Sequence, residues 1–153
     1  MAKCEIRLPD DLSDLITKLG DKTDEVLTST LEAGGEVVLK VAKTNLSRAL
    51  AGSIDRSTGQ LQKTLGLSKV DVDKKGQHNI KVGFAEPRKE QQKGGKYGKY
   101  QKTNAMVANI LEHGKSNQSA KPFMRPARVQ SKKAAEDAMK SKFDAEINKL
   151  GVK

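Results

Sequence analysis

The sequence has no tryptophan, few other aromatic residues and a single cysteine. Aromatic residues make up 3% of the 153 residues, so a buried core has to be built mainly from Leu, Val, Ile and Ala. Cys4 has no second cysteine with which to form an internal disulfide or share a metal ion. We therefore expect one domain spanning residues 1–153, with a modest core, a reducing compartment and a structural role for Cys4.

Long apolar runs are also missing. No segment approaches the roughly 20 consecutive apolar residues that cross a bilayer as a helix. The N-terminal residues MAKCEIRLPDD contain no apolar core of signal-peptide length. We expect a soluble protein that is not exported and does not associate with membranes.

Residue combinations that carry out catalysis are scarce. The two histidines, His78 and His113, have no Cys or His partner at metal-ligand spacing. His113 ends a predicted helix, where a cation is favourable in itself. The sequence contains no nucleophile elbow and no glycine-rich loop that opens a helix. It predicts a protein that is not an enzyme and uses no metal or other cofactor.

Positive charge is abundant and unevenly placed. The formal net charge is +10, yet the first 50 residues hold seven basic residues against nine carboxylates, a net −2. The remainder holds 22 basic residues against ten carboxylates, a net +12. Such a basic part suggests nucleic acid or an acidic protein surface as a partner. The alternative is that lysine-rich faces only keep the protein soluble.

Apolar periodicity predicts an α+β fold. A long helix is expected over about 21–50, because its apolar residues recur at steps of three and four with Gly34-Gly35 in the middle. Asp21 is its expected N-cap, and the glycine pair indicates either a close helix crossing or a kink. The other expected elements are a strand at 4–8, short helices over 11–19, after 57–61 and over 104–113 with Asn104 as N-cap, and a β-hairpin of 67–72 and 79–85. A final helix is expected from Pro126 to about 150, where Gly151 stops it, with an apolar stripe of Ala135, Met139, Phe143, Ile147 and Leu150. The order predicts a small antiparallel sheet with a β-hairpin, packed on one face against the long helix and the C-terminal helix.

A basic loop over about 86–103 has no periodicity, which is typical of a functional or flexible segment. Its lysines alternate with two tyrosines, and this pattern suits phosphates and stacked bases. A contact with a neighbouring protein is an equal alternative. The candidate residues are Arg88, Lys89, Lys93, Lys96, Tyr97, Lys99, Tyr100 and Lys102.

The stretch HGKSNQSAKPFMRPA, residues 113–127, ends in two prolines that bracket Phe123, Met124 and Arg125. Each proline fixes its own φ and disfavours helix in the residue before it, so we expect Lys121 and Arg125 to be extended. Phe123 and Met124 are then held stiffly, as plugs of the local core or as anchors for a partner. We predict a subunit or partner interface at Phe123, Met124 and Arg125.

The same stretch resembles a known family. Glu112-His113-Gly114-Lys115-Ser116, followed by a polar loop and Ala120-Lys121-Pro122-Phe123-Met124-Arg125-Pro126-Ala127, is similar to the signature of the small tail-component family of long-tailed double-stranded DNA phages and prophages. Ser57-Thr58-Gly59-Gln60-Leu61 is similar to the family's T-G-x-L step between long helix and hairpin. The similarity spans about residues 27–150.

The resemblance implies a non-enzymatic virion protein of the head-to-tail joint, a neck or tail-completion component assembled in the bacterial host cytoplasm. It implies a homo-oligomeric ring, commonly sixfold, around the channel through which double-stranded DNA passes without sequence recognition. Its implied partners are connector or head-completion proteins and tail tube or terminator proteins. The alternative hypothesis is a small nucleic-acid-binding protein that uses the 88–102 loop, and a hydrolase or nuclease has least support.

Overall fold

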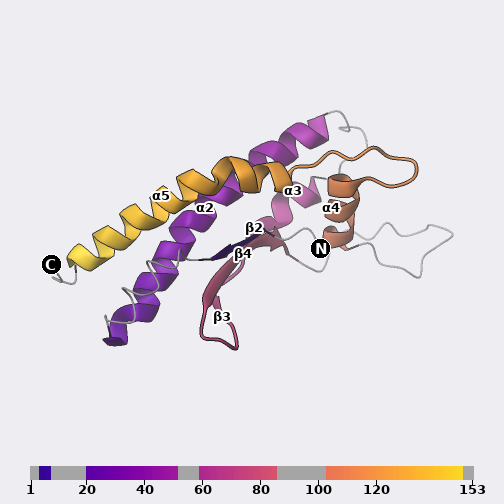
Figure 1. The fold of residues 1–153 in the computed structure, drawn as a ribbon. Coiled ribbons are helices and arrows are strands. Elements are labelled where there is room, and N and C mark those ends of the chain that lie inside the picture. Colours follow the sequence, from indigo (N-terminus) through magenta and orange to yellow (C-terminus); the bar gives the residue numbers. More distant parts are fainter. Residues whose placement is uncertain (1–3, 8–19, 52–58, 86–102, 150–153) are drawn as a thin grey trace.

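A computed structural model describes residues 4–7, 20–51, 59–85 and 103–149 of the chain. Its elements, in chain order, are β1 (Cys4–Arg7), the 3-10 turn η1 (Gly20–Lys22), α2 (Thr23–Leu50), α3 (Gln60–Thr64), β2 (Leu65–Leu67), β3 (Asp71–Val72), β4 (His78–Phe84), α4 (Asn104–His113) and α5 (Met124–Lys149). The fold is α+β, with a small antiparallel sheet, a long helix in the N-terminal half and a long C-terminal helix, as the sequence predicted (Figure 1).

β4 is the central strand of the sheet. β1 pairs with one edge of β4, whereas β2 and β3 pair with the other edge, all antiparallel. The predicted hairpin is confirmed, but its first strand is interrupted between Leu67 and Asp71. Ser68 bridges this break, because its N–H donates to the Lys81 carbonyl (2.8 Å) and its Oγ accepts from the Lys81 N–H (3.0 Å).

The hairpin turn is held by one carboxylate. Asp73 accepts hydrogen bonds from the backbone N–H groups of Lys75 (2.8 Å) and Gln77 (3.0 Å). Gly76 has φ of 76°, a left-handed conformation that a side chain would disfavour. These hydrogen bonds to the charged form lower the pKa of Asp73. His78 lies at the start of β4, and its Nε2 is 3.1 Å from the Asp24 carboxylate of α2.

The long helix was predicted within two residues, but its predicted cap was wrong. The N-cap is Lys22, without a side-chain hydrogen bond, and not Asp21. The reason is the 3-10 turn, which carries the chain past Asp21 before the α-helix begins. Asp24 and Glu25 lie in the first turn, where carboxylates are favoured by the helix dipole.

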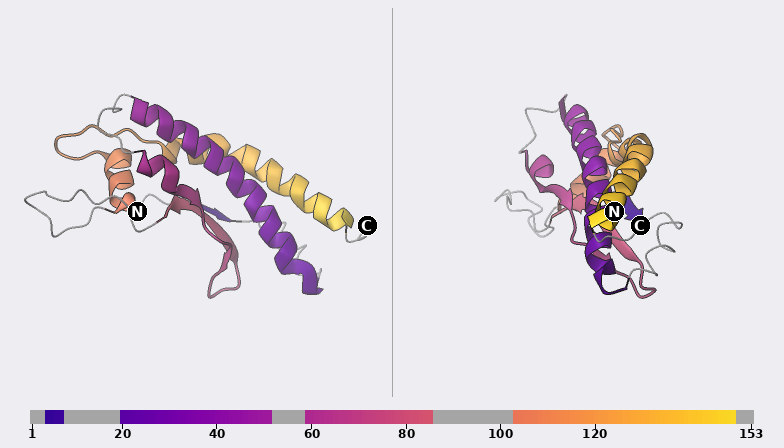
Figure 2. Two further views of the ribbon diagram at one scale, coloured as in Figure 1. Left: turned by 180° about the vertical axis from the view of Figure 1, so that it is seen from behind. Right: turned by 90° about the vertical axis from the view of Figure 1, so that its left-hand side faces the viewer.

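α2 and α5 lie side by side and run in opposite directions over most of their length (Figures 1 and 2). Gly34 of α2 allows this close approach, whereas Gly35 allows the close approach of the sheet. A Cβ on Gly34 would lie 2.5 Å from Cγ of Met139 in α5, and a Cβ on Gly35 would lie 2.9 Å from Cδ2 of Leu67 in β2. Gly34-Gly35 is therefore a crossing point in an uninterrupted helix, which decides between the two alternatives that the sequence left open.

The core lies between the sheet and this helix pair. Ile80 and Val82 of β4 are buried beneath α2, whose Leu31 and Leu46 are fully buried. Ala135, Met139 and Phe143 are the buried residues of the predicted α5 stripe, and Ile147 is half-buried. Leu150 and Gly151, the predicted end of that helix, lie outside the described residues.

Other sequence predictions also fall outside them. The short helix over 11–19, Ser57-Thr58 and the loop residues from Arg88 to Lys102 are not among the residues described. Among the described helices, none has the length and apolar content required to span a bilayer.

Candidate assembly site at the entry to the last helix

The chain between α4 and α5 is a closed polar loop. Gly114 caps α4 with φ of 77°, and a Cβ there would lie 2.8 Å from both the Ala120 nitrogen and the Gln118 oxygen. Lys115 and Gln118 form an antiparallel bridge, with N–H to O distances of 2.9 and 3.0 Å. The Lys121 N–H then donates to the Leu111 carbonyl (2.8 Å), which returns the chain to the end of α4.

Glu112 of α4 caps the first turn of α5. Its Oε2 accepts from the backbone N–H groups of Phe123 (2.8 Å) and Met124 (2.9 Å), and its Oε1 accepts from that of Arg125 (2.9 Å). The glutamate is 6% exposed. A helix start leaves such N–H groups without intrahelical partners and carries a partial positive charge, so a buried carboxylate satisfies both requirements at once.

The two prolines complete this arrangement. Neither Pro122 nor Pro126 has an N–H to donate, and the three residues between them are those bound to Glu112. The first intrahelical bond is then donated by Ala127 N–H to the Phe123 carbonyl (3.2 Å). Every backbone donor of residues 122–127 therefore has a partner or is absent.

Two predictions about this stretch were wrong. α5 begins at Met124 and not at Pro126, so Arg125 is helical although it precedes a proline. The cause is Glu112, whose hydrogen bonds fix Met124 and Arg125 in the first turn and override the extended preference. Lys121, the other residue before a proline, lies outside the helices and strands.

The structure places Phe123 and Met124 in the core of the subunit itself. Phe123 is 0% exposed, with its ring edge-on to that of Phe84 of β4 at a centroid distance of 6.0 Å. Met124 is 4% exposed, whereas Arg125 is exposed. Of the three residues predicted for a subunit or partner interface, only Arg125 has an exposed side chain.

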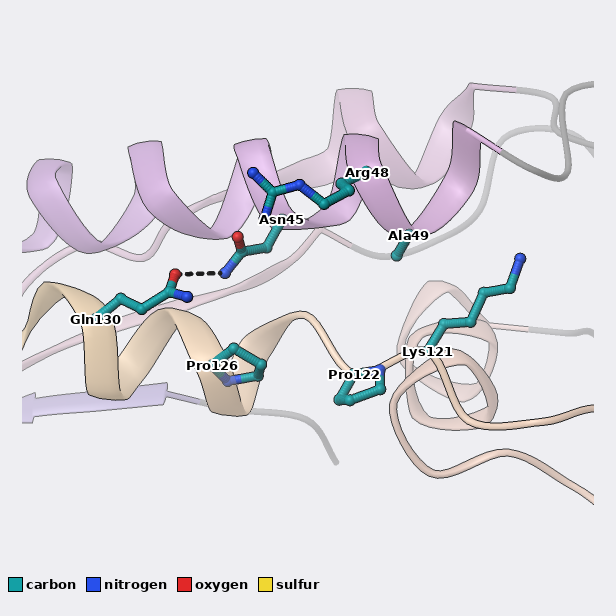
Figure 3. Close-up of a pocket in the computed structure, with 7 residues that line it drawn as sticks. All are labelled: Asn45, Arg48, Ala49, Lys121, Pro122, Pro126 and Gln130. Carbon is teal, nitrogen blue, oxygen red and sulfur yellow. Dashed lines mark hydrogen bonds between the residues drawn. The ribbon is translucent and has the colours of Figure 1, made fainter.

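Beside this segment lies an open cleft of about 310 Å³ between the end of α2 and the start of α5 (Figure 3). Asn45 joins its two walls, because its Nδ2 donates to Gln130 Oε1 (3.2 Å) and to the Phe123 carbonyl (3.4 Å). The cleft contains two cations and no carboxylate, so it favours an anionic group. It is lined by Asn45, Arg48, Ala49, Lys121, Pro122, Pro126 and Gln130.

A second hollow of about 390 Å³ lies over β2 and β4. Gly66 and Gly83 are directly paired across the two strands, and a Cβ on either would meet nothing within 4 Å. Asn104 closes one end of the sheet, because its Nδ2 donates to the Ala85 carbonyl (2.9 Å). Thr103, and not Asn104, is the N-cap of α4, with its hydroxyl accepting from the Met106 N–H (3.1 Å).

Chemistry-bearing side chains are not gathered at either hollow. Within the described ranges, no group of three or more His, Cys, Asp or Glu residues is placed to hold a metal ion. Cys4 is buried in β1, and this burial raises the pKa of its thiol. His113 lies exposed in the last turn of α4. The candidate DNA or partner loop, from Arg88 to Lys102, lies outside the described residues.

Sequence reasoning did not identify the role of Glu112. The usual signal for an N-cap is a Ser, Thr, Asp or Asn at the helix start, but Phe123 occupies that position. The cap comes from a preceding helix, 11 residues earlier than its first donor. The sequence signal for a distant cap was that no Ser, Thr, Asp or Asn lies between the two prolines at the start of the helix.

The fold and the site define a small α+β protein built around an antiparallel pair of long helices and presenting charged surfaces. Comparison with protein families identifies the group to which it belongs. Residues 10–114 match the family model described as "Bacteriophage HK97-gp10, putative tail-component". The chain belongs to this family of phage tail components, which implies a location in the virion. No curated protein and no solved structure matches the chain.

The match confirms the family that the sequence resembles. It ends at Gly114 and therefore does not include Phe123, Met124 and Arg125, on which much of the resemblance was based. It includes Glu112, the residue that fixes the segment containing those three.

Proposed function

We propose that the protein is a structural component of the phage head-to-tail joint, a neck or tail-completion protein that forms a ring around the DNA channel. The observation that carries this proposal is the family match over residues 10–114. The structure adds support in the form of exposed, segregated charge and an open cationic cleft, features suited to association with other proteins. In this role the protein has no enzymatic activity and needs no cofactor.

The proposed partners are further copies of the chain, in a ring that is commonly sixfold, together with connector or head-completion proteins and tail tube or terminator proteins. Ring assembly would stabilise a fold with a modest core, because association favours the folded subunit by mass action. Lysines that are outside subunit contacts would face passing double-stranded DNA, where attraction needs no sequence recognition. Assembly would take place in the cytoplasm of the bacterial host.

A phage or prophage that lacks this gene tests the proposal. We expect such a mutant to make filled heads and complete tails that do not join, and we expect the wild-type gene to restore infectious particles. Electron microscopy of the lysate distinguishes unjoined heads and tails from a failure within the tail. Normal, infectious particles without the protein would refute the proposed role.

Variants at the entry to α5 separate assembly from folding. Phe123→Ala removes a fully buried ring and is expected to destabilise the fold by roughly 3–5 kcal/mol, so lost assembly would follow from unfolding. Arg125→Ala changes an exposed side chain and should leave the unfolding midpoint unchanged. A folded Arg125→Ala protein that fails to restore head–tail joining would place this residue at a contact; full restoration would exclude it.

The alternative, a nucleic-acid-binding protein that uses the 88–102 loop, makes a different prediction. It requires salt-dependent duplex binding by the isolated chain, weakened when the loop lysines are neutralised. No binding at moderate salt, together with the joining defect described above, would eliminate it.

A further inference from the structure

Charge is segregated along the α2–α5 pair. The C-terminal part of α2, from Lys40, and the N-terminal part of α5, up to Ala135, together contain seven basic residues and no carboxylate. We call this the basic end, and because the helices are antiparallel its two parts lie together (Figure 1). Its basic residues are Lys40, Lys43, Arg48, Arg125, Arg128, Lys132 and Lys133, all exposed.

The opposite end of the pair is acidic. The part of α2 from Thr23 to Leu39 contains four carboxylates and no basic residue, and α5 from Glu136 to Lys149 contains four carboxylates and three lysines. Two of those lysines are bound to Glu146, at 2.9 Å each. We call this the acidic end, and its carboxylates are Asp24, Glu25, Glu32, Glu36, Glu136, Asp137, Asp144 and Glu146.

The change of sign occurs within one exposed stripe of α2. Glu25, Glu32, Glu36, Lys40 and Lys43 follow at steps of seven, four, four and three residues, so they share one face of the helix. All five are exposed. The stripe therefore presents carboxylates at one end of the helix pair and ammonium groups at the other.

The positive charges of the basic end are not neutralised within the subunit. None of the seven cations of the basic end forms an ion pair within the described part of the chain. The centres of the two α2 clusters are about 14 residues, or roughly 21 Å, apart along the helix, whereas charges are screened over about 8 Å at physiological salt. Each end therefore acts as a separate surface.

The basic end also repels itself. Arg128 and Lys132 are like charges four residues apart on α5, and Lys40 and Lys43 are like charges three residues apart on α2. Such pairs destabilise an isolated helix. In their midst Val129 is 74% exposed, an apolar side chain left in water. Beside them is the cationic cleft that contains Arg48 and Lys121. A partner that brings carboxylates would relieve the repulsion between these basic residues, and its contact would cover Val129.

We propose that the basic end of the helix pair, with its cleft, binds the acidic end of a second copy of this chain. The chain itself carries the complementary surface, on the same two helices and along the same stripe. Duplex DNA fits less well, because DNA lying along the helix pair would be repelled by the carboxylates of the acidic end. This inference rests on the proposed function, where each subunit of a ring uses both ends and leaves none unpaired.

Charge reversal at each end tests the inference. The basic-end variant carries Lys43→Glu and Lys132→Glu, and the acidic-end variant carries Glu32→Lys and Glu36→Lys. The four side chains are exposed, so both variants should fold, as circular dichroism will check. A control variant, Lys63→Glu with Lys69→Glu, makes the same change in net charge as the basic-end variant, at exposed positions outside both ends.

Sedimentation at about 50 mM salt measures self-association. We expect the wild-type chain and the control variant to associate, and each end variant to associate at least about tenfold more weakly. An equimolar mixture of the two end variants should associate like the wild type, because the glutamates placed in the basic end of one variant then face the lysines placed in the acidic end of the other. High salt should dissociate the wild-type complex.

The outcomes separate this inference from the proposed function. A wild-type chain that stays monomeric at millimolar concentration and low salt would overturn the inference, as would binding of duplex DNA that only the basic-end variant loses. End variants that associate as strongly as the wild type would also overturn the inference. If those variants form a ring through a different contact, the proposed function still stands. A closed dimer restored by mixing would support the contact between ends and contradict a ring.

Discussion

Replacement of Glu112 tests the principal structural conclusion, that one buried carboxylate fixes the start of the last helix. Glu112→Gln preserves the size of the side chain but leaves one oxygen to accept hydrogen bonds. That oxygen can retain the N–H groups of Phe123 and Met124, which share Oε2, while the amide group faces the N–H of Arg125. The variant therefore loses the negative charge and at least one of three hydrogen bonds.

The magnitude follows from the chemistry of the site. Hydrogen bonds to a charged acceptor contribute about 1.5–3 kcal/mol each, and a buried donor left unpaired costs about 1–3 kcal/mol. We expect Glu112→Gln to lower the free energy of unfolding by about 1–3 kcal/mol. Glu112→Ala leaves all three donors unpaired, and we expect it to lose about 3–5 kcal/mol, a large part of the stability of a small domain.

Urea unfolding followed by circular dichroism measures these differences, with protein concentration kept low so that association does not contribute. Glu32→Gln is the matched control, because this glutamate of α2 is exposed and the chemical change is identical. The control should be neutral within about 0.5 kcal/mol. If Glu112→Gln is as neutral as the control, the carboxylate does not hold the helix start and the reasoning fails.

Three further predictions concern other parts of the fold. Gly34→Ala should destabilise the protein by about 1–3 kcal/mol although Ala favours helix, because the added Cβ would lie 2.5 Å from Cγ of Met139. A gain in thermal stability would show that α2 and α5 are loosely packed at this crossing. The pKa of Asp73 is lowered by hydrogen bonds from the backbone N–H groups of Gln77 and Lys75. The stabilisation of the hairpin by this carboxylate is therefore present above the ordinary pKa of 3.8 and is lost as the pH falls below 3.8. The NMR chemical shift of the Asp73 carboxyl group should titrate below pH 3.8, and a midpoint at the ordinary value would contradict the hydrogen bonds. Cys4 is buried and the pKa of its thiol is raised by that burial, so it should react with Ellman's reagent slowly in the native protein and fast in urea; equal rates would show that β1 is open.

The elements that the sequence predicted well have local causes. The apolar steps of α2 and the alternation of Ile80, Val82 and Phe84 in β4 identify a buried face without knowledge of the partner. The hairpin turn was found because Lys74-Lys75-Gly76-Gln77 separates two strand-like segments. In each case, the signal and the structure lie within one short window of the chain.

The features that were missed depend on residues far apart in the sequence. Whether Gly34 marked a kink or a crossing was decided by Met139, about a hundred residues later. The start of α5 was misplaced because Glu112, in another helix, satisfies the donors that a local cap normally satisfies. Burial of both Phe123 and Met124 likewise depends on Phe84 and α2, which no local pattern around the prolines specifies.

The antiparallel α2–α5 pair has a consequence for the order in which the chain folds during synthesis. α2 leaves the ribosome early, but the helix that covers its crossing glycine begins only at Met124, and the donors that satisfy Glu112 are Phe123 and the first two residues of that helix. A nascent chain that ends at Gly114 therefore exposes an apolar stripe of α2 and an uncompensated carboxylate. At a synthesis rate of about 5–20 residues per second, α2 waits several seconds for its partner helix, an interval in which such a chain is prone to aggregate.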